Sequence, residues 1–236
     1  MISAFIVCRD AAHLLPSLIT NARRVCSEVL VAVDPQSSDD TLSVARTLAD
    51  DAWLPERAEF MPDSARNEAA ARCHGDWLLM LDDDELLPPA LQIALLNLAS
   101  ERYAFQEYVF RRRHVSPDGQ QWITSEPWWP DWQVRLRSRQ AWQQWEWPVA
   151  THGTPPDGPH RGWFMASALW HLKFAVKSAA QRTDTMQRWG ATMPYALSDH
   201  FRKFSLPESY HYEVAPFDEP APQELAQMLE AGCCQR

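Results

Sequence analysis

Short, largely apolar runs recur along the first hundred residues, and segments with helical spacing separate them. Four of these runs have the continuous apolar character of buried parallel strands: Ile2–Cys8, Glu28–Val33, 52–54 and 77–81. The segments between them carry helix-capping residues and apolar positions three or four apart, which predicts helices at 13–25, after Ser38, over 64–74 and after Pro88. This alternation predicts an α/β fold with a mainly parallel sheet and helices on both of its faces.

The pattern changes after residue 100. Strand signals cover 103–115, which ends in a basic run from Arg111 to His114, and helix signals cover 169–189 and 223–231. Neither an internal repeat nor a flexible linker interrupts the chain. We therefore expect a single domain over residues 1–236, built from a first half of residues 1–100 and a second half of residues 101–236 that ends in helices.

Charge and composition exclude several classes of protein. The 236-residue chain carries a formal net charge of −9, and such a surface repels nucleic acid, so we expect no nucleic-acid partner. Its five cysteines lack metal-ligand spacing, which favours a reduced, cytoplasmic chain. No stretch reaches the roughly 18 uncharged apolar residues of a membrane-spanning helix, which leaves only a peripheral membrane contact open.

The predicted strand at 77–81 runs directly into four carboxylates: Asp82, Asp83, Asp84 and Glu85. Adjacent carboxylates repel one another unless a positive group binds them. A hard divalent cation binds carboxylate oxygens and keeps coordination sites for a phosphate ligand. Asp34 follows a neighbouring strand, and parallel sheets bind ligands at the carboxyl ends of their strands. The pattern therefore favours a metal–nucleotide site, with a solvated acidic turn as the alternative.

Several stretches, in order and at this spacing, resemble family 2 glycosyltransferases. They include Val-Ala-Val-Asp at 31–34, Ala-Arg-Asn at 65–67 and Leu-Asp-Asp-Asp-Glu at 81–85. The resemblance covers at least the first hundred residues, and the Arg-Asn pair is similar to that of lipopolysaccharide-core-type members. It implies a GT-A fold, a hexosyltransferase-type enzyme of cell-envelope polysaccharide biosynthesis, a nucleotide-sugar donor, a glycan or lipid-linked acceptor, and usually inversion at the anomeric carbon.

The resemblance also implies roles for particular residues in the first half. Mg²⁺ or Mn²⁺ on the donor diphosphate would be bound by the Asp-x-Asp pair, Asp82 and Asp84, with His171 as a further candidate ligand. Contacts to the nucleotide sugar are expected from six residues: Asp34, Asp39, Arg66, Asn67, Asp82 and Asp83. Residues 1–100 would thus form the nucleotide-sugar-binding half, and residues 101–236 the acceptor half.

The segment at 129–137 is similar to a Pro-x-Trp-Gln-x-Arg-Leu segment of the core-type transferases. Inverting transfer needs a base for the acceptor hydroxyl. We expect Asp131 to be this base, because desolvation between Trp129 and Trp132 would raise its pKa. The alternative is an exposed loop aspartate or a partner of an arginine. His152 is the second candidate for the catalytic base.

Arg135 and Arg137 alternate along a predicted strand and are expected to share a face. They could bind an anionic acceptor or the diphosphate, and structural salt bridges are the alternative. The tryptophans between 122 and 163 suit stacking on sugar rings or a place in the core.

Three other functions share some of these features. A HAD-type phosphatase also has Asp-x-Asp after a strand, but early in its chain and followed by Thr. A nucleotidyltransferase opens with a Gly-rich basic loop, which residues 8–15 lack. The third is a non-catalytic relic of the fold that binds nucleotide sugar or carbohydrate, and donor hydrolysis that requires a metal would count against it.

Overall fold

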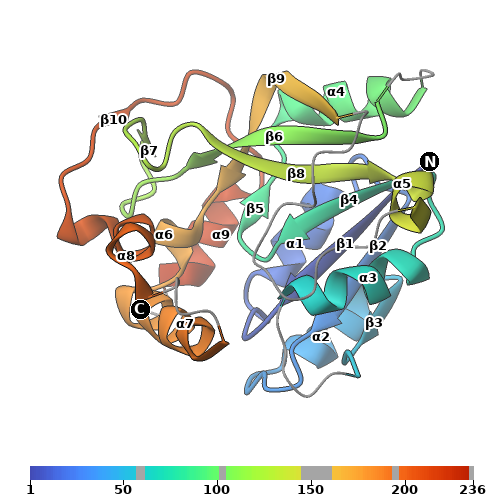
Figure 1. Cartoon of the computed structure of the whole chain (residues 1–236), viewed down its shortest axis with the longest axis horizontal. Coiled ribbons are helices and arrows are strands. Elements are labelled where there is room, and N and C mark those ends of the chain that lie inside the picture. The colour runs from blue at the N-terminus through green and yellow to red at the C-terminus, as the bar shows by residue number, and fades with distance from the viewer. Residues whose placement is uncertain (57–61, 101–104, 145–160, 193–196, 234–236) are drawn as a thin grey trace.

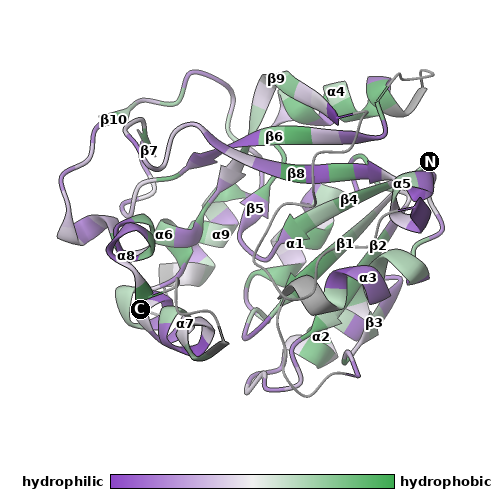
Figure 2. Ribbon diagram, viewed as in Figure 1, coloured by the Kyte–Doolittle hydropathy of each residue, from purple (hydrophilic) through white to green (hydrophobic). Residues whose placement is uncertain are grey.

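The computed structural model describes residues 1–56, 62–100, 105–144, 161–192 and 197–233. Within these residues, one curled sheet has eight strands in the order β3-β2-β1-β4-β8-β6-β9-β5 (Figure 1). Its first four strands are mutually parallel: β1 (Ile2–Cys8), β2 (Glu28–Val33), β3 (Asp51–Trp53) and β4 (Trp77–Asp82). Of these, β1 and β2 are largely apolar in the ribbon, as continuous runs buried on both faces should be (Figure 2).

The rest of the sheet is mixed. Strand β8 (Asp131–Ser138) runs antiparallel to β4 and to β6 (Glu107–His114), and β6 is parallel to β9 (Arg161–His171). The two-residue strand β5 (Glu85–Leu86) closes the far edge against β9. A small second sheet joins β7 (Trp122–Ile123) to β10 (Val214–Ala215).

Helices cover both faces of the large sheet. One face packs against α1 (Leu15–Ala22), α4 (Pro89–Ser100), α6 (Lys173–Val176) and α9 (Leu225–Cys233), and the other against α3 (Pro62–Arg72) and α5 (Arg139–Gln144). The remaining helices are α2 (Thr41–Leu48), α7 (Ala179–Thr192), α8 (Asp199–Ser205) and a 3₁₀ turn at Pro207–Ser209.

The predicted α/β architecture is confirmed, and the strand at Glu28–Val33 has the predicted bounds. The long helix predicted over 169–189 is wrong. Leu169 to His171 are the end of β9, and helix begins only at Lys173. This segment pairs with both β6 and β5, and pairing within the sheet overrides its local helix preference.

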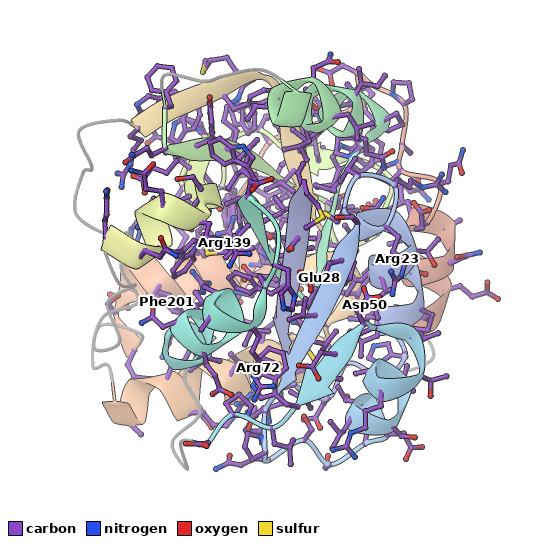
Figure 3. The ribbon with its side chains drawn as sticks, turned by 90° about the vertical axis from the view of Figure 1, so that its right-hand side faces the viewer. Arg23, Glu28, Asp50, Arg72, Arg139 and Phe201 are labelled. Atoms are coloured by element: carbon purple, nitrogen blue, oxygen red, sulfur yellow. The ribbon has the colours of Figure 1, made fainter. Side chains whose placement is uncertain are left out.

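Arginine side chains link helices to the segments next to the strands. Arg139 of α5 donates to the carbonyl oxygens of Cys73 and Gly75, just before β4, at 2.7 and 3.0 Å. Arg23 and Asp50 form an exposed ion pair of 3.1 Å on the other side of the parallel strands (Figure 3). Among the described residues, no helix has the length and apolar character required to span a bilayer.

Candidate active site

Acidic residues stand at the carboxyl ends of β2 and β4, the two parallel strands that flank β1. Asp34 comes directly after β2, and Asp82 is the last residue of β4. The next two residues form the tight turn that leads into β5. The backbone N–H of Asp82 donates to the Glu85 carboxylate at 3.1 Å, which closes this turn. The acidic run therefore lies at the edge where a parallel sheet binds its ligands.

Three arginines surround the side chains of Asp82 and Glu85. Arg135 Nη2 lies 2.7 Å from Glu85 Oε1 and also contacts Asp82. Arg112 Nη1 is 3.4 Å from both carboxylates, and Arg66 Nη2 is 3.5 Å from Asp82 Oδ1. Burial by itself raises the pKa of Asp82, but these arginines, Arg135 first, hold it well below its usual range. Guanidinium groups thus contact both oxygens of Asp82, and a metal ion could bind there only if these ion pairs were broken.

Lys177 and His171 bind the other two carboxylates. Lys177 Nζ is 2.5 Å from Asp83 Oδ1 and 2.9 Å from Asp84 Oδ2, and His171 Nε2 is 3.1 Å from Asp84 Oδ1. Burial raises the pKa of Asp83 to about 6, in spite of Lys177. Burial also opposes ionisation of Asp84, yet Lys177 above all outweighs it and keeps the pKa of Asp84 well below its usual range. Asp84 is therefore an ionised carboxylate beside an imidazole.

A chain of buried side chains runs from Asp84 to Asp131 through two histidines. His171 Nδ1 is 3.0 Å from His114 Nδ1, and His114 Nε2 is 2.9 Å from Asp131 Oδ2. Burial lowers the pKa of both histidines, that of His171 to about 3, so both rings are neutral near pH 7. Each neutral imidazole brings one N–H. The two N–H groups can form hydrogen bonds in only two of the three contacts between Asp84, His171, His114 and Asp131. The remaining contact has no proton between its two atoms.

The raised pKa predicted for Asp131 is wrong. Strand pairing places Arg112 directly opposite Asp131, and its Nε and Nη2 lie 2.7 and 2.6 Å from Asp131 Oδ2. Burial would raise the pKa of Asp131, but Arg112 and then His114 hold it well below its usual range. A carboxylate stabilised in this way is a weak base, and the geometry speaks against the general-base role expected of it.

The predicted nucleoside-side residues have different surroundings. Asp34 is buried, lies 3.1 Å from Arg9 Nη1 and accepts from the N–H of Gln36 at 2.8 Å. Asp39 accepts from the backbone N–H groups of Ala12 and Thr41 at 3.1 and 3.0 Å, so it holds the loop before α2 together. Asn67 follows Arg66 on α3 and is half-buried.

Arg135 and Arg137 do not act on a common partner. The register of β6 against β8 shifts at Arg135, so Arg135 has no partner residue on β6. Its side chain pairs with Asp82 and Glu85. Arg137 lies 3.4 Å from Glu107 Oε2 and covers the ring of Trp142 at 4.5 Å, almost wholly buried. Both arginines therefore form salt bridges within the protein, which was the alternative to ligand binding in the sequence analysis. His152 lies outside the described residues.

Sequence reasoning missed three contributors to this network: Arg112, His114 and Lys177. The first two belong to the basic run at the end of β6, where strand alternation could have placed them on one face. Nothing in the sequence marked Lys177 as a site residue, because it fell inside the long helix predicted over 169–189. In the structure it follows α6, which positions its amine on the acidic turn.

Asp84 and His171 are suited to hold a divalent metal ion. If His114 donates to Asp131 and His171 Nδ1 donates to His114, the Nε2 lone pair of His171 faces Asp84, as a ligand pair requires. Within the described ranges, no set of three or more His, Cys, Asp or Glu side chains is arranged to hold a metal ion. Mg²⁺ commonly uses one or two protein carboxylates and completes its shell with water and substrate phosphate, so this pair fits.

Sequence comparison finds relatives that match a little over a third of the chain. An "Uncharacterized glycosyltransferase" of Rickettsia felis is 32% identical over 91 residues, which are 39% of this chain and 31% of that relative. A TPR repeat-containing protein of Synechococcus elongatus is 34% identical over 86 residues, or 36% of this chain and 21% of that relative. The matches thus span less than a third of each relative's length.

Solved structures share the fold at low sequence identity. Residues 1–349 of S. aureus TarS match with a TM-score of 0.54 and 13% identity, over 88% of this chain and 73% of that chain. A mannosyltransferase of Pyrobaculum calidifontis, solved with GDP-Man and Mn²⁺, matches with a TM-score of 0.52 and 13% identity, over 98% of this chain and 68% of that one. The expected GT-A fold is thereby confirmed. Residues 3–154, more than half of the chain, match the profile of the family described as "Glycosyl transferase family 2", and the chain belongs to this family.

Proposed function

We propose that this protein transfers a sugar, with inversion and with the help of Mg²⁺ or Mn²⁺, from a nucleotide-sugar donor to a hydroxyl of a glycan or lipid-linked acceptor. The observation that carries the proposal is the Asp84–His171 pair, 3.1 Å apart at the carboxyl edge of the parallel strands. Support comes from fold relatives: TarS was solved with UDP and with UDP-GlcNAc, and the Pyrobaculum enzyme with GDP-Man and Mn²⁺.

In this proposal the donor is bound by residues of the first half together with His171 of the second half. Asp34, at the end of β2, would bind the nucleoside, and Asp84 and His171 would hold the metal ion. A metal ion held there would supply positive charge to the departing diphosphate. Arg66, Arg112 and Arg135 pair with Asp82, and the last two also pair with Glu85, which fixes the turn that carries Asp84. The acceptor is bound by the half formed from residues 101–236, where His152 stays the candidate base.

Asp131 has a positioning role in this scheme. It accepts from His114, whose other ring nitrogen faces His171. A carboxylate at the end of such a chain fixes the tautomer of a metal-binding histidine and holds its ring in place. Arg112 keeps Asp131 ionised, as this role requires.

A thermal-shift screen tests the proposed function directly. Nucleoside diphosphates and nucleotide sugars of uridine and guanosine are added with Mn²⁺ or with a chelator. We expect one nucleotide series to raise the melting temperature in Mn²⁺, and much less with the chelator, because a ligand that binds only the folded state stabilises it by mass action. Release of nucleoside diphosphate from the matching sugar should stop with the chelator and return with added Mn²⁺. Stabilisation without any metal-dependent turnover would favour the non-catalytic relic.

Asp131→Asn separates the positioning role from a base role. Losing a partner of this kind typically weakens metal binding by about 10–100-fold, so we expect Mn²⁺ affinity in the presence of nucleotide to fall by that amount. Excess Mn²⁺ should then restore most of the turnover. Electron paramagnetic resonance of free Mn²⁺ measures the affinity. Unchanged Mn²⁺ affinity, together with a loss of transfer that Mn²⁺ does not rescue, would return Asp131 to the role of base.

A further inference from the structure

Lys177 forms ion pairs with two carboxylates of the acidic turn, one of them Asp84, which the proposed function assigns to the metal ion. Its ammonium contacts Asp83 Oδ1 and Asp84 Oδ2, while His171 faces the other oxygen of Asp84. The Lys177 side chain is 27% exposed, whereas those of Asp83 and Asp84 are 11% and 5% exposed. The amine therefore covers the acidic turn from the solvent side. Its four-carbon stem is flexible, so the ammonium can change partners while the backbone stays in place.

The charges of the network are nearly balanced without a metal ion. In the part of the chain that the structure describes, its ion pairs join five carboxylates to four cations: Asp82, Asp83, Asp84, Glu85 and Asp131 to Arg66, Arg112, Arg135 and Lys177. A divalent ion arriving alone would add two positive charges and displace Lys177 from its partners. A displaced, partly buried ammonium is costly unless it finds another anion.

A nucleoside diphosphate supplies that anion. It brings negative charge at the same moment as the metal ion, and its phosphate oxygens accept hydrogen bonds from an ammonium group. The pair of ligands therefore enters the network with little change in net charge, whereas either ligand alone disturbs the balance.

We propose that Lys177 is a resident counter-cation, which holds Asp83 and Asp84 until donor and metal arrive together and then passes to the donor diphosphate. Metal ion and nucleotide consequently bind with positive cooperativity, and metal alone binds weakly. This inference rests on the proposed function, since it takes Asp84 as a metal ligand. Lys177 thus has two roles: it weakens metal binding while no nucleotide is bound, and it contacts the leaving group once the donor has bound.

The test is a titration of the full chain with Mn²⁺ alone, followed by electron paramagnetic resonance, and then a repeat with saturating UDP or GDP, whichever stabilises the protein. Lys177→Met removes the ammonium and keeps most of the stem. Lys173→Met is the matched control, because Lys173 is also partly buried near Asp84 but forms none of these ion pairs in the structure; its amine lies 3.5 Å from Ser205 Oγ.

We expect nucleotide to raise the Mn²⁺ affinity of the natural protein by about tenfold or more, which is an ordinary coupling between two sites. Lys177→Met should bind Mn²⁺ alone about tenfold more tightly than the natural protein and retain a coupling below about threefold. Lys173→Met should keep the coupling of the natural protein. Melting temperatures verify that each variant is folded, and Lys177→Gln, which keeps a neutral donor, replaces Lys177→Met if the latter is unstable.

Equal affinities of the natural protein and Lys177→Met for Mn²⁺ alone would overturn the inference, and so would an undiminished coupling in Lys177→Met. Either result leaves the proposed function intact as long as nucleotide and Mn²⁺ still bind. If neither protein binds Mn²⁺ with any nucleotide, the metal dependence in the proposed function fails, and the inference fails with it.

Discussion

Asp84→Asn is expected to lower the rate of sugar transfer by roughly 10²–10⁴-fold, since neutralisation of leaving-group charge by a bound metal ion contributes several kcal/mol. Asn has nearly the same shape and can still hydrogen-bond His171, but it lacks the charge that attracts a divalent ion. The fold should persist, because Lys177 keeps Asp83 as a partner. The measurement is release of nucleoside diphosphate from the donor in Mn²⁺, together with Mn²⁺ affinity in the presence of nucleotide.

The matched control for this variant is Asp51→Asn. Asp51 forms an exposed ion pair of 3.0 Å with Arg72 on the edge strand β3, so the same chemical change there should leave both turnover and Mn²⁺ binding unaltered. Full activity of Asp84→Asn at low Mn²⁺ would remove Asp84 from the metal site. The pairing of Asp82 with arginines would then have to be broken in the donor complex, making Asp82 the ligand instead.

Arg135→Met is expected to have the largest effect on stability, a loss of about 3–5 kcal/mol in the free energy of unfolding. Arg135 is almost wholly buried and is the main partner of Glu85, which is fully buried. Among the described residues, its removal leaves Glu85 the longer 3.4 Å ion pair with Arg112 and the hydrogen bond from the N–H of Asp82. A buried carboxylate deprived of its partner is far more costly than an absent ion pair. Urea unfolding followed by tryptophan fluorescence measures the change.

Arg188→Met provides the comparison for Arg135→Met. Arg188 pairs with Asp184 one turn away on α7, at 2.9 Å, and both side chains are substantially exposed. Such a pair contributes less than about 1 kcal/mol, so the variant should unfold close to the natural protein. Similar losses for the two arginine variants would show that Glu85 is not held as an ionised, buried carboxylate.

Much of the first half of the fold could be predicted from the pattern of residues. Strands β1 and β2 lie in the middle of a parallel sheet, are buried on both faces, and so appear as unbroken apolar runs. The position of the acidic turn followed from the same pattern, because a residue directly after such a strand must lie at its carboxyl end. Local sequence sufficed there, since each strand is recognised without knowledge of its neighbours.

The partners of the charged residues depended on the tertiary structure. Asp131 was expected to be a desolvated base, and its role changed because the register of β6 against β8 sets Arg112 opposite it. Lys177 reaches Asp83 across 94 positions of sequence, after a strand that had been read as helix. Burial and net charge of a carboxylate depend on which distant side chains arrive beside it, and no periodicity in the chain encodes that. The sequence thus located the acidic turn. Packing between the two halves decided which carboxylate oxygens of this turn pair with arginine or lysine and which one faces a histidine.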